Sequence, residues 1–398
     1  MRCVQRVITA RDVLIGPAGQ HVRGGAVLIE DDTIRAVGPR AEVERAAEPG
    51  AVRSDHPRHT LLPGLINCHV HLAFNAGPQV VADVQQAGDE ELLLGMAGRA
   101  QRLLAAGVTT VRDLGDRGGL LFRLREAVEC GDPAGPRILA SGPPLTPPRG
   151  HCWFLGGEVD GPAAIRERVR RNAELGADVI KVMASGGEIT PESVSMRARQ
   201  FTAEDLALVV QEARAAGLPV AAHAHGTDSI ADAVAAGVDT VEHCTWMSAD
   251  GNGYDIREDV GRSMVERGIR ACFGWPVRWR EFLAALGPLA GDAEGRFRWM
   301  RDAGLPLLIG TDAGVSPRSG FDEFAGALEL YAEFGFPPEE VLEMVTTGNA
   351  TGIGLGDRTG RLAAGYAADL LVVEGDPRTD LTALRTPSLV LARGRPVA

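Results

Sequence analysis

Histidine side chains with the spacing of metal ligands follow an apolar segment early in the chain. Residues 62–67 lead into His69 and His71. Two residues apart on a strand, both imidazoles point to the same side and can hold one metal ion. A single His-x-His pair is weak evidence by itself, because two polar rings can also cap the mouth of a barrel.

Three further apolar segments end in the same way, at His223, at His243 and at Asp312. Taken singly, each of these side chains is explained by a structural histidine or by an aspartate that caps a helix. Together with His69 and His71, however, they occupy equivalent points of a repeating unit, and five separate coincidences would be needed. The pattern therefore predicts a metal site.

Lys181 is the only lysine among 41 basic residues, and all the others are arginine. It ends the apolar segment 177–180, as the metal-ligand candidates end theirs. Only an amine can lose its proton and act as a nucleophile, so Lys181 is a candidate for amine chemistry, although chance survival explains the count equally well.

Beside metal ions Lys181 is expected to be neutral or chemically changed, because a protonated amine would be repelled. A neutral amine can add carbon dioxide and form a carbamate that bridges two ions. In this hypothesis a hydroxide and the carbamylated lysine lie between two metals. One metal is held by His69, His71 and Asp312, and the other by His223 and His243.

The segments that would position these side chains repeat a strand and then a helix. Eight such units between residues 61 and 355 are the expected size of a (β/α)8 TIM barrel, an α/β fold with its chemistry at the carboxyl ends of the strands. Periodicity does not show closure, so an open doubly wound sheet is the structural alternative. Strands are predicted at 65–71, 108–114, 137–141, 179–184, 219–223, 240–243, 270–273 and 306–311, and helices at 90–106, 118–130, 163–175, 203–216 and 229–236.

Both ends of the chain have a different pattern, that of short strands separated by Gly, Pro and Asp. The strand-like segments are 6–15, 25–30 and 33–38 at one end, and 369–374 and 388–393 at the other. We therefore expect one small β domain built from residues 1–60 and 356–398, beside a metal-dependent barrel of residues 61–355.

The composition of the chain limits the classes of partner that it is expected to bind. The 398 residues include 53 acidic and 41 basic side chains, for a formal net charge of −12. Such a chain repels phosphate backbones and anionic lipids on average, so neither nucleic acid nor membrane is an expected partner. We find no transmembrane run and no signal peptide in the sequence. Six scattered cysteines are typical of reduced thiols, and a cytoplasmic location is expected.

These motifs together resemble the amidohydrolase superfamily. The resemblance rests on residues 63–71, 180–181, 222–226, 242–243 and 310–314, and it extends to 347–351 and 365–370. It implies that the small domain is a composite β-sandwich, as in many such enzymes. Within the superfamily the chain is similar to the imidazolonepropionase-related branch that includes Xaa-Pro dipeptidases. Members of that branch with a lysine on the fourth strand are expected to hold two metals, which implies N6-carboxylysine at Lys181.

Three more residues are candidates for catalysis or substrate binding. His225 shares a side with His223 if the strand continues that far. His151 lies in the loop after the third strand, from which a histidine of related peptidases contacts the substrate or the oxyanion. A structural role is equally open for both. Arg278, flanked by aromatic residues in the loop after the seventh strand, is expected to anchor a carboxylate.

The resulting hypothesis is a hydrolase that cleaves a C–N bond in an amide, a peptide or a cyclic amide. Two divalent cations, with zinc as the first expectation, would lower the pKa of a shared water. Asp312 would accept the proton of this water and transfer it to the leaving nitrogen, and His151 or His225 would help to stabilise the oxyanion.

We expect a small substrate, either an N-acylated amino acid or a dipeptide-like amide. The alternatives are ring opening or cyclisation of a cyclic amide, another non-peptide reaction at the same site, and a non-catalytic barrel scaffold. A homo-oligomer is compatible with the sequence, which does not determine the oligomeric state.

Overall fold

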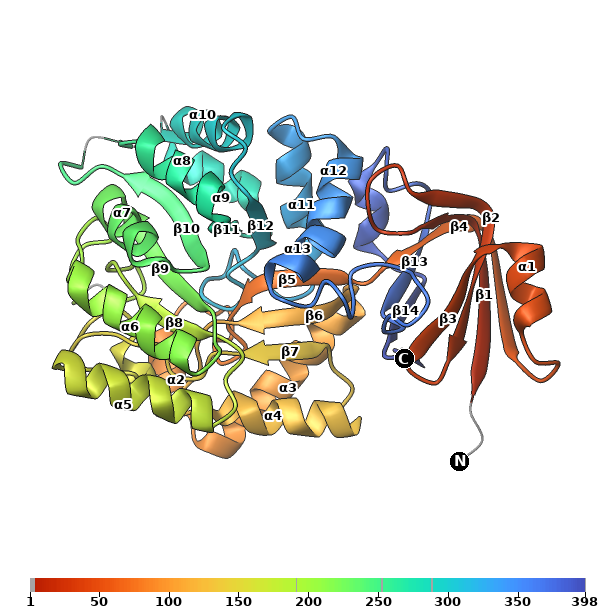
Figure 1. Ribbon diagram of the computed structural model, residues 1–398, viewed down its shortest axis with the longest axis horizontal. Helices are drawn as coiled ribbons and strands as arrows, with labels where there is room; N and C mark the ends of the chain where they lie inside the picture. The colour runs from red at the N-terminus through yellow and green to blue at the C-terminus, as the bar shows by residue number, and fades with distance from the viewer. Residues whose placement is uncertain (1–3, 191, 252, 288, 398) are drawn as a thin grey trace.

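The computed structural model describes residues 4–190, 192–251, 253–287 and 289–397. Its larger part is built from parallel strands with helices packed around them. Its smaller part is a sheet that takes strands from both ends of the chain, and the red N-terminal and blue C-terminal strands lie together at one side of Figure 1.

Eight parallel strands form the centre of the larger part. They are hydrogen-bonded in chain order as one sheet of three strands and one of five. Each predicted strand is present, with ends that differ by a few residues, so the predicted parallel α/β class is confirmed. The strands are β5 (Leu65–Val70), β6 (Val108–Asp113), β7 (Arg137–Ala140), β8 (Ile180–Met183), β9 (Val220–Gly226), β10 (Thr240–Met247), β11 (Arg270–Gly274) and β12 (Leu307–Gly310).

Backbone hydrogen bonds connect the three-stranded sheet to the five-stranded sheet after β7. The Leu145 N–H donates to the carbonyl oxygen of Lys181 at 2.8 Å, and the Met183 N–H donates to the carbonyl oxygen of Leu145 at 2.9 Å. This is the pattern of a parallel ladder continued past the end of β7. It brings the loop after β7 next to Lys181.

A second set of hydrogen bonds connects β12 to β5, the last strand of the series to the first. The Asp312 N–H donates to the carbonyl oxygen of His69 at 2.9 Å. Asn349 is buried, and its Nδ2 donates to the carbonyl oxygens of Ile66 at 2.7 Å and Ile309 at 2.9 Å. The two sheets are therefore linked at both of their edges.

Helices pack on the strands, and each helix buries its apolar face in this contact. Helix α6, for example, begins at a capping box of Thr202 and Asp205 and buries Leu206, Val209 and Val210. The longer helices are α2 (Val80–Gln86), α3 (Asp89–Ala105), α4 (Leu120–Cys130), α5 (Gly161–Glu174), α6 (Ala203–Ala215), α7 (Thr227–Ala236), α8 (Glu258–Arg267), α9 (Trp279–Leu286), α10 (Leu289–Asp302), α11 (Phe324–Glu333) and α12 (Pro338–Glu343). Short helical turns are η1 (Trp153–Leu155), η2 (Met344–Gly348) and α13 (Asn349–Gly352). Within the described ranges, none of the helices has both the length and the apolar character needed to cross a bilayer.

The composite β-sandwich stays a prediction for the smaller part, in which Val27 and Ile29 from one end of the chain and Leu370 and Val372 from the other belong to one hydrophobic cluster. The strands of this part are hydrogen-bonded as one continuous sheet in the order β15-β14-β13-β4-β1-β2-β3. The sheet is continuous because β4 pairs with β1 over most of its length and with β13 over its last residues. The elements are β1 (Gln5–Leu14), β2 (His21–Glu30), β3 (Thr33–Pro39), α1 (Arg40–Ala46), β4 (Val52–Pro63), β13 (Leu370–Glu374), η3 (Leu381–Arg385), β14 (Leu389–Ala392) and β15 (Arg395–Pro396).

Strand β4 is not among the predicted strands, although it joins the two halves of this sheet. Its first residues are polar and it contains Pro57, which argues against a central strand. The structure accommodates the proline at an irregularity, because the register with β1 shifts between Ala10 paired with His56 and Asp12 paired with Thr60.

Candidate metal centre

The ends of β5 and β12 bring together His69, His71 and Asp312, as predicted. The two imidazole Nε2 atoms are 3.3 Å apart. Asp312 Oδ1 lies 3.4 Å from the Nε2 of His69 and 3.2 Å from that of His71. Zinc bonds of about 2.0–2.1 Å at tetrahedral angles place ligand atoms roughly 3.3–3.4 Å from one another. These three atoms therefore converge at the spacing that a small divalent cation needs.

The protonation states of His69 and Asp312 also suit a metal. Burial and the charge of Lys181 together lower the pKa of His69 to about 4. Burial acts to raise the pKa of Asp312, but His69 and His71 outweigh it and bring that pKa down to about 2. At neutral pH the group therefore offers a neutral imidazole at His69 and an ionised carboxylate, the forms that bind metal ions.

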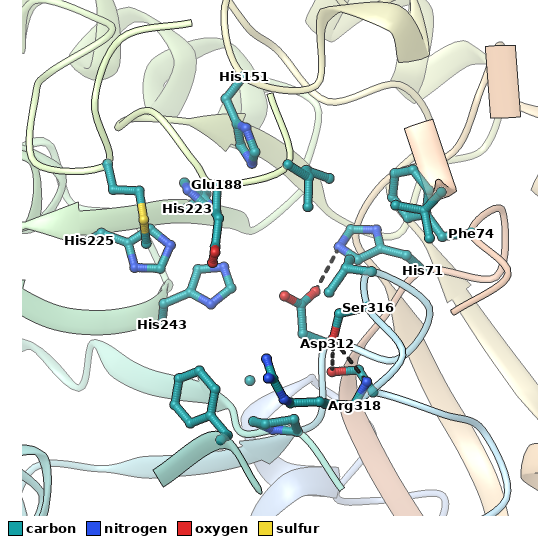
Figure 2. A pocket seen from close by; sticks show the side chains of 18 of the residues that line it. His71, Phe74, His151, Glu188, His223, His225, His243, Asp312, Ser316 and Arg318 are labelled. Carbon is teal, nitrogen blue, oxygen red and sulfur yellow. Dashed lines mark hydrogen bonds and ion pairs between the residues drawn. The ribbon is translucent and has the colours of Figure 1, made fainter. Parts of the chain in front are cut away.

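The ends of β9 and β10 form a second group of possible ligands. His223, His225 and His243 each offer a ring nitrogen, and these nitrogens lie within 4.8 Å of one another. Strand β9 continues to Gly226, so His225 does share the side of His223. Its ring stacks on that of His243, with centroids 4.5 Å apart at 16°, and Figure 2 shows the three rings facing one space. The structure thus places His225 with the two predicted ligands.

Lys181 ends up buried near both groups. Its side chain is 1% exposed, and its Nζ has no hydrogen-bond partner in the described part of the chain. Burial lowers its pKa, and its charge in turn lowers the pKa of His69 in the first group and of His223 and His243 in the second. An unpaired buried ammonium is costly, so this setting favours an uncharged or modified amine.

His151 reaches the same space from the loop after β7. Its ring centroid is 4.7 Å from that of His223, and burial lowers its pKa to about 3, which leaves the imidazole neutral. The approach requires a glycine at 187, because a Cβ there would lie 2.2 Å from the ring of His151. The loop after β8 thus has no side chain where the histidine enters.

The structure does not bring Arg278 to this site, contrary to the expected carboxylate anchor. Arg278 precedes helix α9, its side chain is 52% exposed, and its Nε lies 3.7 Å from Glu323 Oε2. It is not among the residues that line the cavity over the metal-ligand groups, whereas Arg296 and Arg318 are. The loop after β11 instead contributes Trp275 and Pro276, because its backbone turns before Arg278 is reached.

Glu242 and Arg112 hold the first ligand group in place from the side opposite the cavity. No sequence motif predicts this positioning role. Glu242 Oε2 lies 2.9 Å from His69 Nδ1, and Arg112 Nη2 donates to Glu242 Oε1 at 2.8 Å. Both side chains are buried. The contact to Nδ1 orients the ring so that its Nε2 faces His71 and Asp312. The signal in the sequence is a charged residue within each of two predicted strands, 240–243 and 108–114.

Replacing Glu242 by glutamine is expected to destabilise the fold by about 3–5 kcal/mol, because it leaves the buried guanidinium of Arg112 without a counter-charge. Metal affinity should also fall about 10–100-fold, since the ring of His69 loses its anionic partner. Urea unfolding and metal titration would measure the two effects. Glu294→Gln, which breaks an exposed ion pair with Arg298, is the matched control and should change both much less.

Two of the predicted ligands have backbone conformations that the sequence does not reveal. His243 has a φ of 66° and Asp312 a φ of 52°, both in the left-handed region. Such conformations cost about 1–3 kcal/mol each and concentrate at functional sites. The first lies where the pairing of β10 with β9 becomes irregular, and the second lies two residues past the end of β12.

A cavity of about 690 Å³ opens over the ligand groups. This is the size of a small-molecule site. His71, Lys181, His243 and Asp312 are among the lining residues, and the remaining wall is largely apolar, with Phe74, Met247, Trp275, Phe282 and Leu286. In Figure 2, Glu188 points into the same space from the loop after β8.

A parallel α/β fold with imidazole and carboxylate groups converging under a cavity defines a class of metal-binding enzymes. The chain belongs to the amidohydrolase family, whose model matches residues 60–263 and 293–397. Residues 25–47 match a second model, the imidazolonepropionase-like composite domain of bacteria. The predicted family and its imidazolonepropionase-related branch are therefore confirmed.

Individual relatives agree with this assignment over most of the chain. The ochratoxinase of Aspergillus niger is 28% identical over 415 residues, which cover 95% of this chain and 83% of that protein. The imidazolonepropionase of Chromobacterium violaceum is 27% identical and covers 88% and 85%. The crystal structure of a Xaa-Pro dipeptidase with methionine bound in its active site is 27% identical, covers 98% and 99%, and superposes with a TM-score of 0.84. This chain is accordingly a hydrolase that acts on carbon–nitrogen bonds, which removes the scaffold alternative.

Proposed function

We propose that this chain hydrolyses the amide bond of a small N-acylated amino acid or dipeptide-like substrate at a centre of two divalent cations, with zinc as the expected metal. The observation that carries the proposal is the pair of ligand groups under one cavity, both within electrostatic reach of the unpartnered amine of Lys181. The methionine in the active site of the Xaa-Pro dipeptidase supports an amino-acid-like substrate.

The scaffold in this proposal is a closed (β/α)8 barrel of residues 61–355, with residues 1–60 and 356–398 as the small domain. The hydrogen bonds at both edges of the two parallel sheets support closure. A closed ring of strands would hold the ligand-bearing strand ends at fixed distances, which a site built from five strands requires.

In the proposed centre, His69, His71 and Asp312 would hold one ion, and His223 and His243 would hold the other. Carboxylated Lys181 would supply an anionic ligand to the centre. His225 lies close enough to His223 and His243 to ligate the same ion or to contact the substrate. When bound, the cations would polarise the substrate carbonyl and acidify a water molecule.

The chain's own side chains then move the proton and hold the substrate. Asp312 is ionised and faces the ligand nitrogens, so it can accept a proton from the attacking water and pass it to the leaving nitrogen. His151 is neutral and lines the cavity beside His223, where its N–H can donate to the oxyanion.

Elemental analysis combined with a substrate panel would test the proposal. We expect two metal ions per chain after expression with zinc and bicarbonate, and hydrolysis of N-acyl amino acids or dipeptides. The panel includes a cyclic amide, because ring opening is the remaining alternative within the class. One ion per chain would refute the two-metal centre, and activity confined to the cyclic amide would refute the substrate class.

A further inference from the structure

A buried arginine lines the cavity with no carboxylate at salt-bridge distance among the described residues. Arg296, on helix α10, is 4% exposed and lines the cavity wall. Its Nε and Nη1 have no hydrogen-bond partner among the described residues, and no carboxylate within those residues forms a salt bridge with it. Its guanidinium carbon sits 4.1 Å from the centre of the Tyr254 ring, and Asp292, one turn earlier on the helix, acts on its charge without forming an ion pair with it.

The other fully buried arginine near the site shows how this fold treats a guanidinium that serves structure alone. Arg112 is paired with Glu242 at 2.8 Å, and it also donates to the carbonyl oxygen of Cys68 at 2.8 Å and to Thr240 Oγ1 at 3.1 Å. Leaving a buried charged donor unpaired costs more than leaving a neutral one. Arg296 has such unpaired nitrogen atoms, and it lies in a cavity where a ligand could bind to them.

Packing does not require an arginine at this point of α10. Ala293, Phe297 and Met300 are fully buried, and they define the stripe by which the helix packs on the core. Arg296 falls between them, one turn from Ala293 and one turn from Met300. An apolar residue would fill this position without the desolvation penalty.

The position of Arg296 relative to the metal-ligand groups suits an anchoring role. Arg296 and the three histidines of the second ligand group line the same cavity. Apolar side chains of the same cavity wall, Met247, Trp275 and Phe282, can surround a hydrophobic substituent. A substrate held by an anionic group at Arg296 would therefore present its remaining atoms to the ligand groups.

We propose that Arg296 binds the carboxylate of the substrate, so that the enzyme selects N-acylated amino acids with a free carboxylate and an apolar side chain. Guanidinium–carboxylate pairs are among the strong charge-assisted hydrogen bonds, and they gain most where water is excluded. This inference rests on the proposed function and assigns to Arg296 the role that the sequence suggested for Arg278.

The test measures binding separately from turnover, on the zinc-loaded full chain. The binding probes are 3-phenylpropanoate and 3-phenylpropanol, which differ mainly in the carboxylate. The substrates are N-acetyl-L-phenylalanine and N-acetylphenethylamine, which share the amide bond. The variants are Arg296→Gln, Arg296→Lys and, as the matched control, Arg298→Gln on the same helix, whose exposed side chain pairs with Glu294.

In the wild type we expect 3-phenylpropanoate to bind at least about 100-fold more tightly than the alcohol, because a site built for a charged group rejects the analogue that lacks it. Arg296→Gln should abolish this preference, mainly through weaker binding of the carboxylate. It should raise the KM of N-acetyl-L-phenylalanine by a similar factor and leave N-acetylphenethylamine within about threefold. Arg296→Lys should retain part of the preference, and Arg298→Gln all of it.

The outcomes distinguish the carboxylate anchor at Arg296 from the proposed reaction. Lost preference in Arg296→Gln without turnover of any substrate would support the anchor and refute the proposed reaction. Turnover with equal binding of both probes would refute the anchor alone. An unchanged preference in Arg296→Gln would also refute it, because the carboxylate would then be bound by another group, such as the metal ions or Arg318. If Arg296→Gln does not fold, the wild type and Arg296→Lys still test the anchor. Equal binding of the two probes by the wild type, or an undiminished preference in Arg296→Lys, would refute it.

Discussion

Replacing Asp312 by asparagine is expected to lower kcat/KM by at least about 10³-fold with little change in the fold. Loss of a general base costs about 10²–10⁴-fold, and weaker metal binding adds to it. Asparagine has the same shape, but it has neither the negative charge nor the capacity to accept a proton at neutral pH. The effect should appear in kcat as well as in kcat/KM, because the proton moves in the transition state.

The control for this substitution is Asp322→Asn, which removes an exposed carboxylate that pairs with Arg102. It should retain nearly full activity. Metal content must be determined for both variants, so that a lost ligand can be separated from a lost base. If Asp312→Asn kept more than about a tenth of the wild-type activity with a full complement of metal, Asp312 would not be the proton acceptor.

Replacing Lys181 by arginine is the second change with a large expected effect. Arginine keeps the positive charge but cannot lose its proton to form a carbamate. We therefore expect metal content to fall from two ions per chain to one or fewer, and kcat/KM to fall by about 10³-fold or more. A permanent cation between the ligand groups would repel both ions, whereas carbamylation makes the same side chain an anion.

The uniqueness of Lys181 makes its modification directly observable. Protein prepared in ¹³C-bicarbonate should give a carbamate carbon signal in NMR that disappears in Lys181→Arg, because the chain has no second lysine to contribute one. Lys181→Met should fold at least as stably as the metal-free wild type, since it removes an unpaired buried amine. A wild type with two ions and no carbamate signal would contradict the proposed bridge.

The supporting residues explain why the ligand groups keep their geometry in a cavity open to solvent. Glu242 fixes the ring of His69, and Arg112 fixes Glu242, in a layer below the cavity floor. Gly310 allows β12 to approach β5, because a Cβ there would lie 2.5 Å from the Cβ of His69. The ligands that face the substrate thus rest on buried contacts that the substrate does not reach.

The sequence by itself determined the parallel α/β class, the family and the residues of the first candidate ligand group. These follow from local signals: apolar strands that end in His69, His71 or Asp312, and a repeating strand–helix unit whose strand ends must lie on one side. A strand's periodicity and its last residue are properties of adjacent amino acids, so they can be read without knowing what the strand packs against.

Only the tertiary structure decided which arginines line the cavity. Arg278 and Arg296 are equally charged in the sequence, but the first turns to Glu323 at the surface and the second is buried in the cavity wall. The contacts of Glu242 with His69, and the pairing of β4 with both β1 and β13, likewise join residues far apart along the chain. Burial and pairing depend on which surfaces meet when the strands assemble, and no local pattern of residues encodes that.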